Sequence, residues 1–367
     1  MRRTPMLGRT ATMIAALGFA LTGCSTAARP STPTTSPSAA PTGPSAAPTA
    51  ASAAPSPSIA DLSGQIVFVD EQAPPKHAQI WVENANGTNL RQLVTSNFDD
   101  RTPAISPDGR RVLFTRYVPD GAPPDDGGVF VVNVDGTGLR HINTDGEDPS
   151  WSPDGLRLVE TRDLFDPGAA APYSVALWIQ DLDGTGVHQI TGKGMRCDKS
   201  SSCPDGYQDN QAHWSPDGKT LAFLRDVYTS PEHYEIVTAS ADGSNINVVT
   251  PQGMNVGNPT WSRDGSLILF QSPPEPGATQ DLYTIKLDGS GLTQLTSHLS
   301  KDANGVQGVF HPSWSPDGSM IVFSHYPGAS GTLASLYVIR ADGTAMTLIT
   351  HGGLNANGAE WGVLPTP

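Results

Sequence analysis

Polar side chains that could bind a ligand precede a repeated position of the sequence, which is Trp in five of its six copies. Their carboxylate, amide and imidazole groups could together bind a small polar ligand or the end of a peptide. They could equally hold only water, which is the commoner state of such a channel. If the repeats form a ring, we predict that these residues face its central channel or rim: Thr102, Asp148, Gln211, His213, Asn258, His311 and Glu360.

Metal binding is a second kind of chemistry that these residue types could support. Imidazole nitrogens, with Asp302 or Glu360 as an added ligand, suit a transition metal, and clustered carboxylates suit Ca²⁺. The histidines lack a short His-x-His spacing and the acidic clusters lack the EF-hand spacing. We therefore predict no cofactor, with structural Ca²⁺ or another metal as the alternative. The histidines are His77, His298, His311, His325 and His351, and the acidic clusters are Asp120, Asp125 and Asp126, and Asp145, Glu147 and Asp148.

Two cysteines lie close together in the sequence, Cys197 and Cys203, with five residues between them. In an exported protein such a pair usually forms a disulfide. Free thiols and a metal site are the alternatives, although no His-Cys zinc pattern accompanies the pair. We predict a Cys197–Cys203 disulfide that closes a long loop.

The N-terminus has the features of an export signal. Arg2, Arg3 and Arg9 form a basic region, and an apolar run over 11–21 follows that is too short for a permanent membrane-spanning helix. Leu-Thr-Gly-Cys at 21–24 resembles a bacterial lipobox, in which the Cys becomes the lipidated first residue. We predict a lipoprotein signal peptide over 1–23 and lipidation of Cys24, with an ordinary secretory signal as the alternative.

A low-complexity segment follows and separates the signal from an acidic domain. Ala, Pro, Ser and Thr make up 32 of the 34 residues in 25–58, too little apolar surface to fold, so 24–58 is predicted to be a disordered linker. The whole chain has a net charge of −14. Without the four arginines of 1–58, the domain 59–367 has 18 basic and 36 acidic residues, a net charge of −18. This balance argues against a nucleic-acid partner.

The acidic domain consists of repeats with two turn motifs. The first is Trp-Ser-Pro-Asp-Gly or a close variant, in which Pro, Asp and Gly each favour a tight turn. Its copies begin at Ile105, Trp151, Trp214, Trp261 and Trp314, with an incomplete sixth at Trp361. The second is a hairpin turn of the type Asp-Gly-Thr. Its copies begin at Asn86, Asp135, Asp183, Asp242, Asp288 and Asp342.

Apolar strands on both sides of these turns give four strands per repeat. The first repeat lacks its first strand, and the last strand of the chain, over 359–362, lacks its successors. Pairing these two ends would complete a ring of six blades, which is an all-β, six-bladed β-propeller with no free sheet edge at the join. The recurring Trp is then a core anchor rather than a stacking platform for a ligand.

These motifs, such as those over 149–155 and 182–186, resemble the repeats of TolB-type propellers, which also occur in prolyl-oligopeptidase-like enzymes. The resemblance covers nearly all of 61–363 and implies a fold, whereas unrelated activities share this scaffold. Uniform turns fall on one face of the disc and connections of variable length on the other. We expect binding on the variable face, through connections such as 117–127, 162–174, 191–211 and 296–312.

The resemblance implies a non-enzymatic platform in the cell envelope. We expect an extracytoplasmic monomer held to the membrane only by its lipid, with an envelope protein or peptide as its partner. One alternative is a metal-dependent polysaccharide lyase or hydrolase. Another is a cell-wall carbohydrate binder that uses loop aromatics. A peptidase is disfavoured because the sequence contains no Gly-x-Ser-x-Gly motif.

Overall fold

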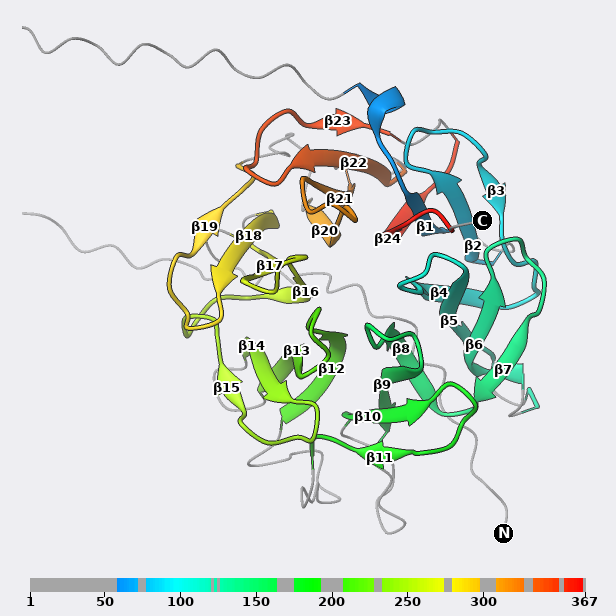
Figure 1. The fold of residues 1–367 in the computed structure, drawn as a ribbon, viewed down its shortest axis with the longest axis horizontal. Coiled ribbons are helices and arrows are strands. Elements are labelled where there is room, and N and C mark those ends of the chain that lie inside the picture. The colour runs from blue at the N-terminus through cyan, green and yellow to red at the C-terminus, as the bar shows by residue number, and fades with distance from the viewer. Residues whose placement is uncertain are drawn as a thin grey trace, which may run out of the picture. The chain divides into compact units, whose positions relative to one another are not determined.

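The computed structural model describes residues 58–71, 77–119, 122–123, 126–163, 175–192, 207–227, 233–273, 279–297, 308–326, 333–349 and 353–365. Within these residues the chain forms six four-stranded antiparallel sheets, arranged as blades around a central axis (Figure 1). The predicted six-bladed propeller is therefore confirmed. Cys24, Cys197 and Cys203 lie outside the described residues, as do the signal peptide and nearly all of the linker.

Each blade runs from a long innermost strand beside the axis to a short outermost strand. Blade 1 contains β24 (Ala356–Gly362), β1 (Gln65–Asp70), β2 (Gln79–Asn84) and β3 (Arg91–Gln92). Blade 2 contains β4 (Asp99–Ile105), β5 (Arg111–Tyr117), β6 (Gly128–Asn133) and β7 (Arg140–Asn143). Blade 3 contains β8 (Gly146–Trp151), β9 (Arg157–Asp163), β10 (Val175–Asp181) and β11 (His188–Gln189).

The remaining three blades follow the same order along the chain. Blade 4 contains β12 (Tyr207–Trp214), β13 (Thr220–Val227), β14 (His233–Ser240) and β15 (Asn247–Val248). Blade 5 contains β16 (Gly257–Trp261), β17 (Leu267–Ser272), β18 (Asp281–Lys286) and β19 (Thr293–Gln294). Blade 6 contains β20 (Val309–Trp314), β21 (Met320–His325), β22 (Ser335–Arg340) and β23 (Thr347–Leu348). A 3-10 helix, η1 (Ile59–Asp61), precedes β1, and no helix in the described part of the chain is long and apolar enough to cross a membrane.

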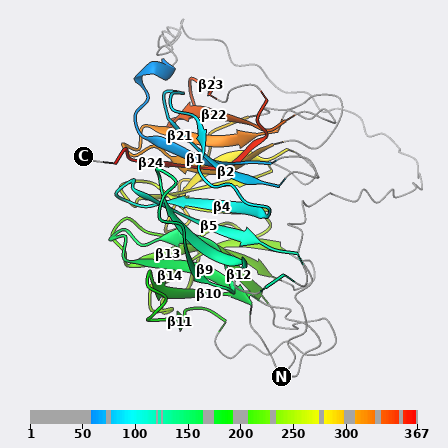
Figure 2. The same cartoon turned by 90° about the vertical axis from the view of Figure 1, so that its right-hand side faces the viewer.

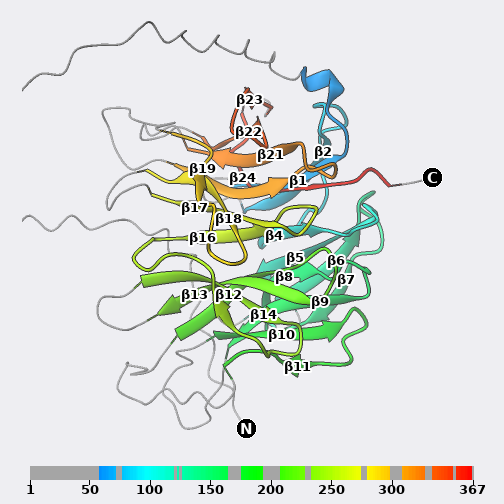
Figure 3. The same cartoon turned by 60° about the vertical axis from the view of Figure 1, so that its left-hand side comes forward.

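Blade 1 closes the ring by pairing the two ends of the described chain. β24 lies antiparallel to β1, with Gln65 opposite Gly362 and Ile66 opposite Trp361 (Figure 3). The Gln65 side chain donates to the carbonyls of Gly109 and Val363, so it links this seam to the first turn of blade 2. Figure 2 shows the C-terminal segment leaving β24 at one face of the disc. The join predicted from the incomplete first and last repeats is thus present.

The repeated Ser-Pro-Asp-Gly turn has its own network of hydrogen bonds. In blade 3 the Ser152 hydroxyl donates to Asp154 Oδ1 at 2.5 Å and accepts the amide of Arg157 at 2.9 Å. Asp154 Oδ1 also accepts the amide of Leu156 at 3.0 Å, and Gly155 has a φ of 68°, which disfavours residues with a Cβ. The motif therefore specifies the hairpin that joins the two inner strands of a blade.

The anchor position is the residue that begins each copy of this turn motif, and it lies in the packing between blades. Trp151 is 6% exposed, and its indole nitrogen donates to the carbonyl of Ala104 in blade 2 at 2.9 Å. Trp214 packs with Val159 and Leu177 of blade 3 as well as with Phe223 of its own blade. The Trp residues therefore join neighbouring sheets, as expected of core anchors. The anchors are Ile105, Trp151, Trp214, Trp261, Trp314 and Trp361.

A bulge interrupts the innermost strand of every blade, three residues before the anchor. The residue at this bulge position has a φ between 48° and 60°, which is a left-handed conformation that glycine and asparagine adopt most easily. The strand register shifts at the same point in each blade. The bulge positions are Thr102, Asp148, Gln211, Asn258, His311 and Gly358.

Candidate ligand-binding cavity

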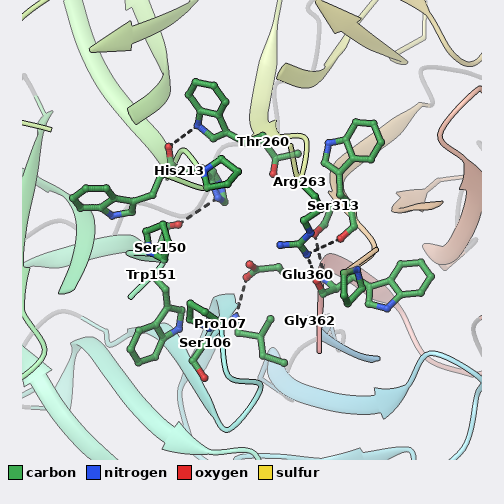
Figure 4. A pocket seen from close by; sticks show the side chains of 18 of the residues that line it. Ser106, Pro107, Ser150, Trp151, His213, Thr260, Arg263, Ser313, Glu360 and Gly362 are labelled. Carbon is green, nitrogen blue, oxygen red and sulfur yellow. Dashed lines mark hydrogen bonds between the residues drawn. The ribbon is translucent and has the colours of Figure 1, made fainter. Parts of the chain in front are cut away.

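A cavity of about 250 Å³ lies on the axis, where the innermost strands end at their Ser-Pro-Asp-Gly turns (Figure 4). Two repeat positions supply most of its lining. The residue directly before the anchor, here called the cavity position, contributes Ser150, His213, Thr260, Ser313 and Glu360. The residue two after the anchor contributes Pro107, Pro153, Pro216, Arg263, Pro316 and Val363. The cavity thus combines an apolar wall with a few polar groups, as small-ligand sites do.

Glu360 reaches into the middle of this cavity from β24 (Figure 4). Its Oε2 accepts the backbone amide of Ile105 at 3.0 Å, which joins blade 1 to blade 2. Burial raises the pKa of Glu360 to about 7, although the Ile105 amide and the Arg263 charge act in the opposite direction. A carboxyl group in this environment exchanges its proton near neutral pH, unlike an exposed glutamate.

Arg263 occupies a turn position that is Pro in four other blades. Its guanidinium group donates to the carbonyls of Ser315 and Trp314 at 3.0 Å and of Trp361 at 2.9 Å. Burial lowers the pKa of Arg263, while the nearby Glu360 acts in the opposite direction. One side chain from blade 5 therefore links blades 6 and 1.

His213 faces the cavity from β12, with its Nδ1 3.4 Å from the hydroxyl of Ser150. Burial lowers the pKa of His213 to about 4, so the imidazole is neutral at physiological pH. A neutral imidazole offers one donor and one acceptor. His213 therefore adds hydrogen-bonding capacity to the cavity without adding charge.

The seven residues predicted to line the channel occupy two levels of the structure. His213 and Glu360 are at cavity positions and line the described cavity, whereas the other five are at bulge positions and do not. Ser150, Thr260, Ser313 and Arg263 also line the cavity and were missed. Counting back from each Trp in every copy would have found the first three, and the break in the Pro pattern was the signal for Arg263. The five at bulge positions are Thr102, Asp148, Gln211, Asn258 and His311.

At the bulge positions, backbone and side chains bond to each other across the inner strands. The Asn258 amide donates to Gln211 Oε1 at 3.0 Å, and the His311 amide donates to Gln271 Oε1 at 3.1 Å. The Asp148 amide donates to Thr115 Oγ1 at 3.1 Å. These contacts support the left-handed backbone at the bulge.

Titratable groups lie near some of these bulge residues, on the side of the bulge that faces away from the cavity. Burial raises the pKa of Asp148 to about 6 and lowers that of His311, which Glu71 partly opposes. Glu71 itself forms an ion pair with Arg101 at 2.5 Å and accepts from Asn357 at 3.3 Å. The residues around the bulge positions therefore form a network of polar and charged side chains that is separate from the cavity lining.

The described residues contain no group of three or more His, Cys, Asp or Glu side chains that could hold a metal. His77 pairs with Asp99 at 3.3 Å, and the His325 ring packs on Tyr337 at 5.4 Å. His298, Asp302 and His351 lie outside the described residues, as do Asp120 and Asp125 and most of the long connections on the predicted variable face. The metal and calcium alternatives stay predictions.

The sequence matches the family model of the TolB beta propeller domain over residues 62–364. The chain belongs to the TolB β-propeller family. This membership confirms the resemblance that the Trp-Ser-Pro-Asp-Gly and Asp-Gly-Thr motifs indicated.

Two relatives in this comparison carry different names. The chain is 27% identical over 212 residues to an "uncharacterized peptidase" of Bacillus subtilis, which covers 48% of this chain and 29% of the relative. It is 29% identical over 118 residues to the Tol-Pal system protein TolB of Francisella tularensis, which covers 32% of this chain and 25% of the relative. The matched part of this TolB propeller therefore spans less than a third of either relative's length.

Solved structures share the fold at low sequence identity. TolB from Acinetobacter baumannii superposes with a TM-score of 0.62 and 18% identity, covering 83% of this chain and 67% of that one. A putative TolB from Agrobacterium tumefaciens gives 0.55 and 17%, covering 81% and 94%. Hydrazine synthase of Kuenenia stuttgartiensis gives 0.59 and 16%, covering 83% and 47%. The spread of names at similar TM-scores shows that the TolB propeller fold alone does not identify an activity.

Proposed function

We propose that this protein is an exported, lipid-anchored TolB propeller that binds a protein or peptide of the cell envelope. The family match over residues 62–364 carries this proposal. It is supported by the relative named as a component of the Tol-Pal system. The acidic charge of 59–367 further favours a partner with basic groups.

The axial cavity favours recognition of a small part of a partner. Its volume of about 250 Å³ suits one side chain or a peptide end rather than a polymer. Five tryptophans and four prolines contribute to its wall, while the side chains of Glu360 and Arg263 place one acidic and one basic group within it. Such a site adds specificity to a larger interface on the disc.

We propose a binding protein rather than an enzyme. The relative named as a peptidase aligns over only 29% of its length, and this sequence has no Gly-x-Ser-x-Gly motif. A metal-dependent lyase or hydrolase would need a ligand cluster, and the described residues hold none. Bound transition metal in the purified protein, together with activity on a polysaccharide that EDTA abolishes, would contradict this proposal.

Membrane attachment through Cys24 is tested by labelling the expressing cells with a radioactive fatty acid. The wild-type chain should take up label and sediment with membranes, whereas Cys24→Ser should take up none and appear in the soluble extracytoplasmic fraction. Label that persists in Cys24→Ser would overturn the anchor. A single sedimenting species of monomer mass in detergent would support the proposed monomer.

Partner binding is tested by cross-linking in intact cells followed by affinity purification of the propeller. We expect one or more envelope proteins to be enriched with the wild-type chain. If the partner contacts the turn face, where the cavity lies, rather than the predicted variable face, large substitutions there such as Leu156→Arg should abolish this capture, since Leu156 is 66% exposed. Capture that persists in Leu156→Arg would favour the variable face. Purification of wall polymer instead of protein would favour the carbohydrate-binding alternative.

A further inference from the structure

The cavity position differs in charge from blade to blade. Going around the ring it is Ala104, Ser150, His213, Thr260, Ser313 and Glu360, so Glu360 is its single acidic residue. Arg263 is the one cationic residue among the side chains that line the cavity. One carboxylate thus stands alone at the cavity position, surrounded by small or neutral neighbours.

The structural role of Glu360 does not require a carboxylate. Its Oε2 accepts the amide of the next anchor, Ile105, at 3.0 Å. At the preceding seam, Ser313 Oγ accepts the amide of the anchor Trp361 at 3.2 Å. Because a neutral hydroxyl makes the equivalent bond, the seam needs an acceptor and not a negative charge. The charge of Glu360 therefore requires a separate reason.

The other carboxylate oxygen of Glu360 is available to a ligand. Oε1 has no hydrogen-bond partner among the described residues, and it belongs to a side chain in the cavity lining. Figure 4 shows the carboxylate between the Arg263 guanidinium and the Ser150–His213 pair. An oxygen in this position can accept from a donor that enters the cavity.

The remaining groups favour a donor that carries positive charge. Arg263 directs three hydrogen bonds to backbone carbonyls, so these contacts already occupy its donors Nε and Nη2. On the opposite side of Glu360, the Ser150 hydroxyl and the neutral His213 imidazole supply further acceptor atoms. The domain's net charge of −18 adds a long-range attraction for cations.

We propose that the axial cavity binds a primary ammonium group, with Glu360 as its counter-ion and Ser150 and His213 as hydrogen-bonding neighbours. This inference rests on the proposed function and specifies it: the ammonium belongs to the bound peptide, either as its N-terminus or as a lysine side chain. A bound ammonium supplies a second positive charge for a buried carboxylate whose one nearby cation, Arg263, directs its hydrogen bonds to backbone carbonyls. Arg263 confines the cation to the Ser150–His213 side.

The test uses the full chain purified in detergent and n-butylamine as the probe. Tryptophans in the cavity wall provide a fluorescence signal on binding. Glu360→Gln is the matched variant, because its amide oxygen still accepts the Ile105 amide while the charge is removed. We expect saturable binding of n-butylamine, at least tenfold weaker in Glu360→Gln, and none of n-butanol or butyrate. Equal binding to both proteins, or stronger binding of butyrate, would overturn the inference.

Two peptides distinguish the sources of the ammonium group. One has a free N-terminus and no lysine, and the other has an acetylated N-terminus and one lysine. Binding of either peptide, weakened by Glu360→Gln, supports the site and identifies its source. No binding of either peptide or of n-butylamine overturns it. If Glu360→Gln still captures the same envelope proteins in cells, the ammonium site fails while the proposed function stands.

Discussion

The bulge and cavity positions are only two residues apart on the same innermost strands, yet they differ in almost every physical respect. The bulge position has a left-handed backbone in every blade, and hydrogen bonds within the ring support it. The cavity position follows the shift in strand register, and the side chains at this position line the axial cavity. The first position shapes the channel, and the second leaves side chains free for binding. The required backbone conformation therefore restricts the bulge position, whereas the residue type at the cavity position can vary from blade to blade.

The largest expected effect comes from removing the residue that ties the cavity level together. Arg263→Ala loses three hydrogen bonds to carbonyls in blades 6 and 1. Hydrogen bonds from a charged donor contribute about 1.5–3 kcal/mol each. Because water can enter the cavity and bond to the freed carbonyls, we expect the free energy of unfolding to fall by about 3–4 kcal/mol rather than by the full sum. Urea denaturation measures this loss. A loss below about 1 kcal/mol would mean that Arg263 contributes no more to stability than a residue in an exposed turn.

The bulge level should be sensitive to backbone strain rather than to chemistry. Asn258 has a φ of 50°, a conformation that a β-branched residue adopts poorly. Asn258→Val should therefore reduce stability by about 2–3 kcal/mol, while Asn258→Gly should be nearly neutral. The matched control is Thr260→Val at the cavity level, where we expect a change below about 1 kcal/mol. Similar losses for both valine variants in thermal unfolding would erase the distinction between the levels.

The pH dependence of stability tests the environment of Glu360 at the cavity position. Its folded pKa of about 7 lies above the unfolded value, so folding favours the protonated form, and stability declines as pH rises from about 4.5 through 7. Glu360→Gln removes this dependence and should stabilise the protein at pH 8 by about 2 kcal/mol, discounted for cavity water. At pH 4 the two proteins should unfold at nearly the same denaturant concentration. A stabilisation of equal size at both pH values would show that the carboxyl titrates normally.

His213 should give a smaller slope of the opposite sign. Its folded pKa of about 4 lies below the unfolded value, so folding favours the neutral ring, and stability falls as pH drops from about 6.5 through 4. His213→Gln should flatten this acid limb, by about 1 kcal/mol at pH 5, and leave stability at pH 8 little changed. NMR titration of the imidazole checks the same assignment directly. A midpoint near 6.5 would place the ring in contact with bulk water.

The repeats made the fold predictable, and they also explain what the sequence could not reveal. Trp-Ser-Pro-Asp-Gly specifies a turn and an anchor through local contacts, so the position of Trp151 or Trp314 follows from the motif. The bulge follows from no such motif, because Thr102, Asp148, Gln211 and His311 share no residue type that signals a left-handed backbone. Its cause is how neighbouring inner strands bond to each other, which is a tertiary effect.

The same effect explains why only some of the residues that line the cavity were predicted from the sequence. The sequence pattern pointed to the few residues before each Trp but could not say which of them reach the axis. The bulge decides this, because a one-residue shift in register turns a strand's side chains to the other face. His213 and Glu360 were therefore found, whereas the smaller Ser150, Thr260 and Ser313 at equivalent positions were not. Arg263 was missed because its guanidinium acts on carbonyls from two other blades.

The join between β24 and β1 also determines when the molecule can be completed. During biosynthesis β1 emerges early, but the partner for its axial edge is encoded at 356–362, near the end of the chain. Until that segment arrives, blade 1 has an open edge of the kind that recruits foreign strands. Contacts between segments almost 300 residues apart form slowly. A nascent chain that stalls before residue 356 is therefore left with an aggregation-prone intermediate, and that edge needs protection until the last strand has been made.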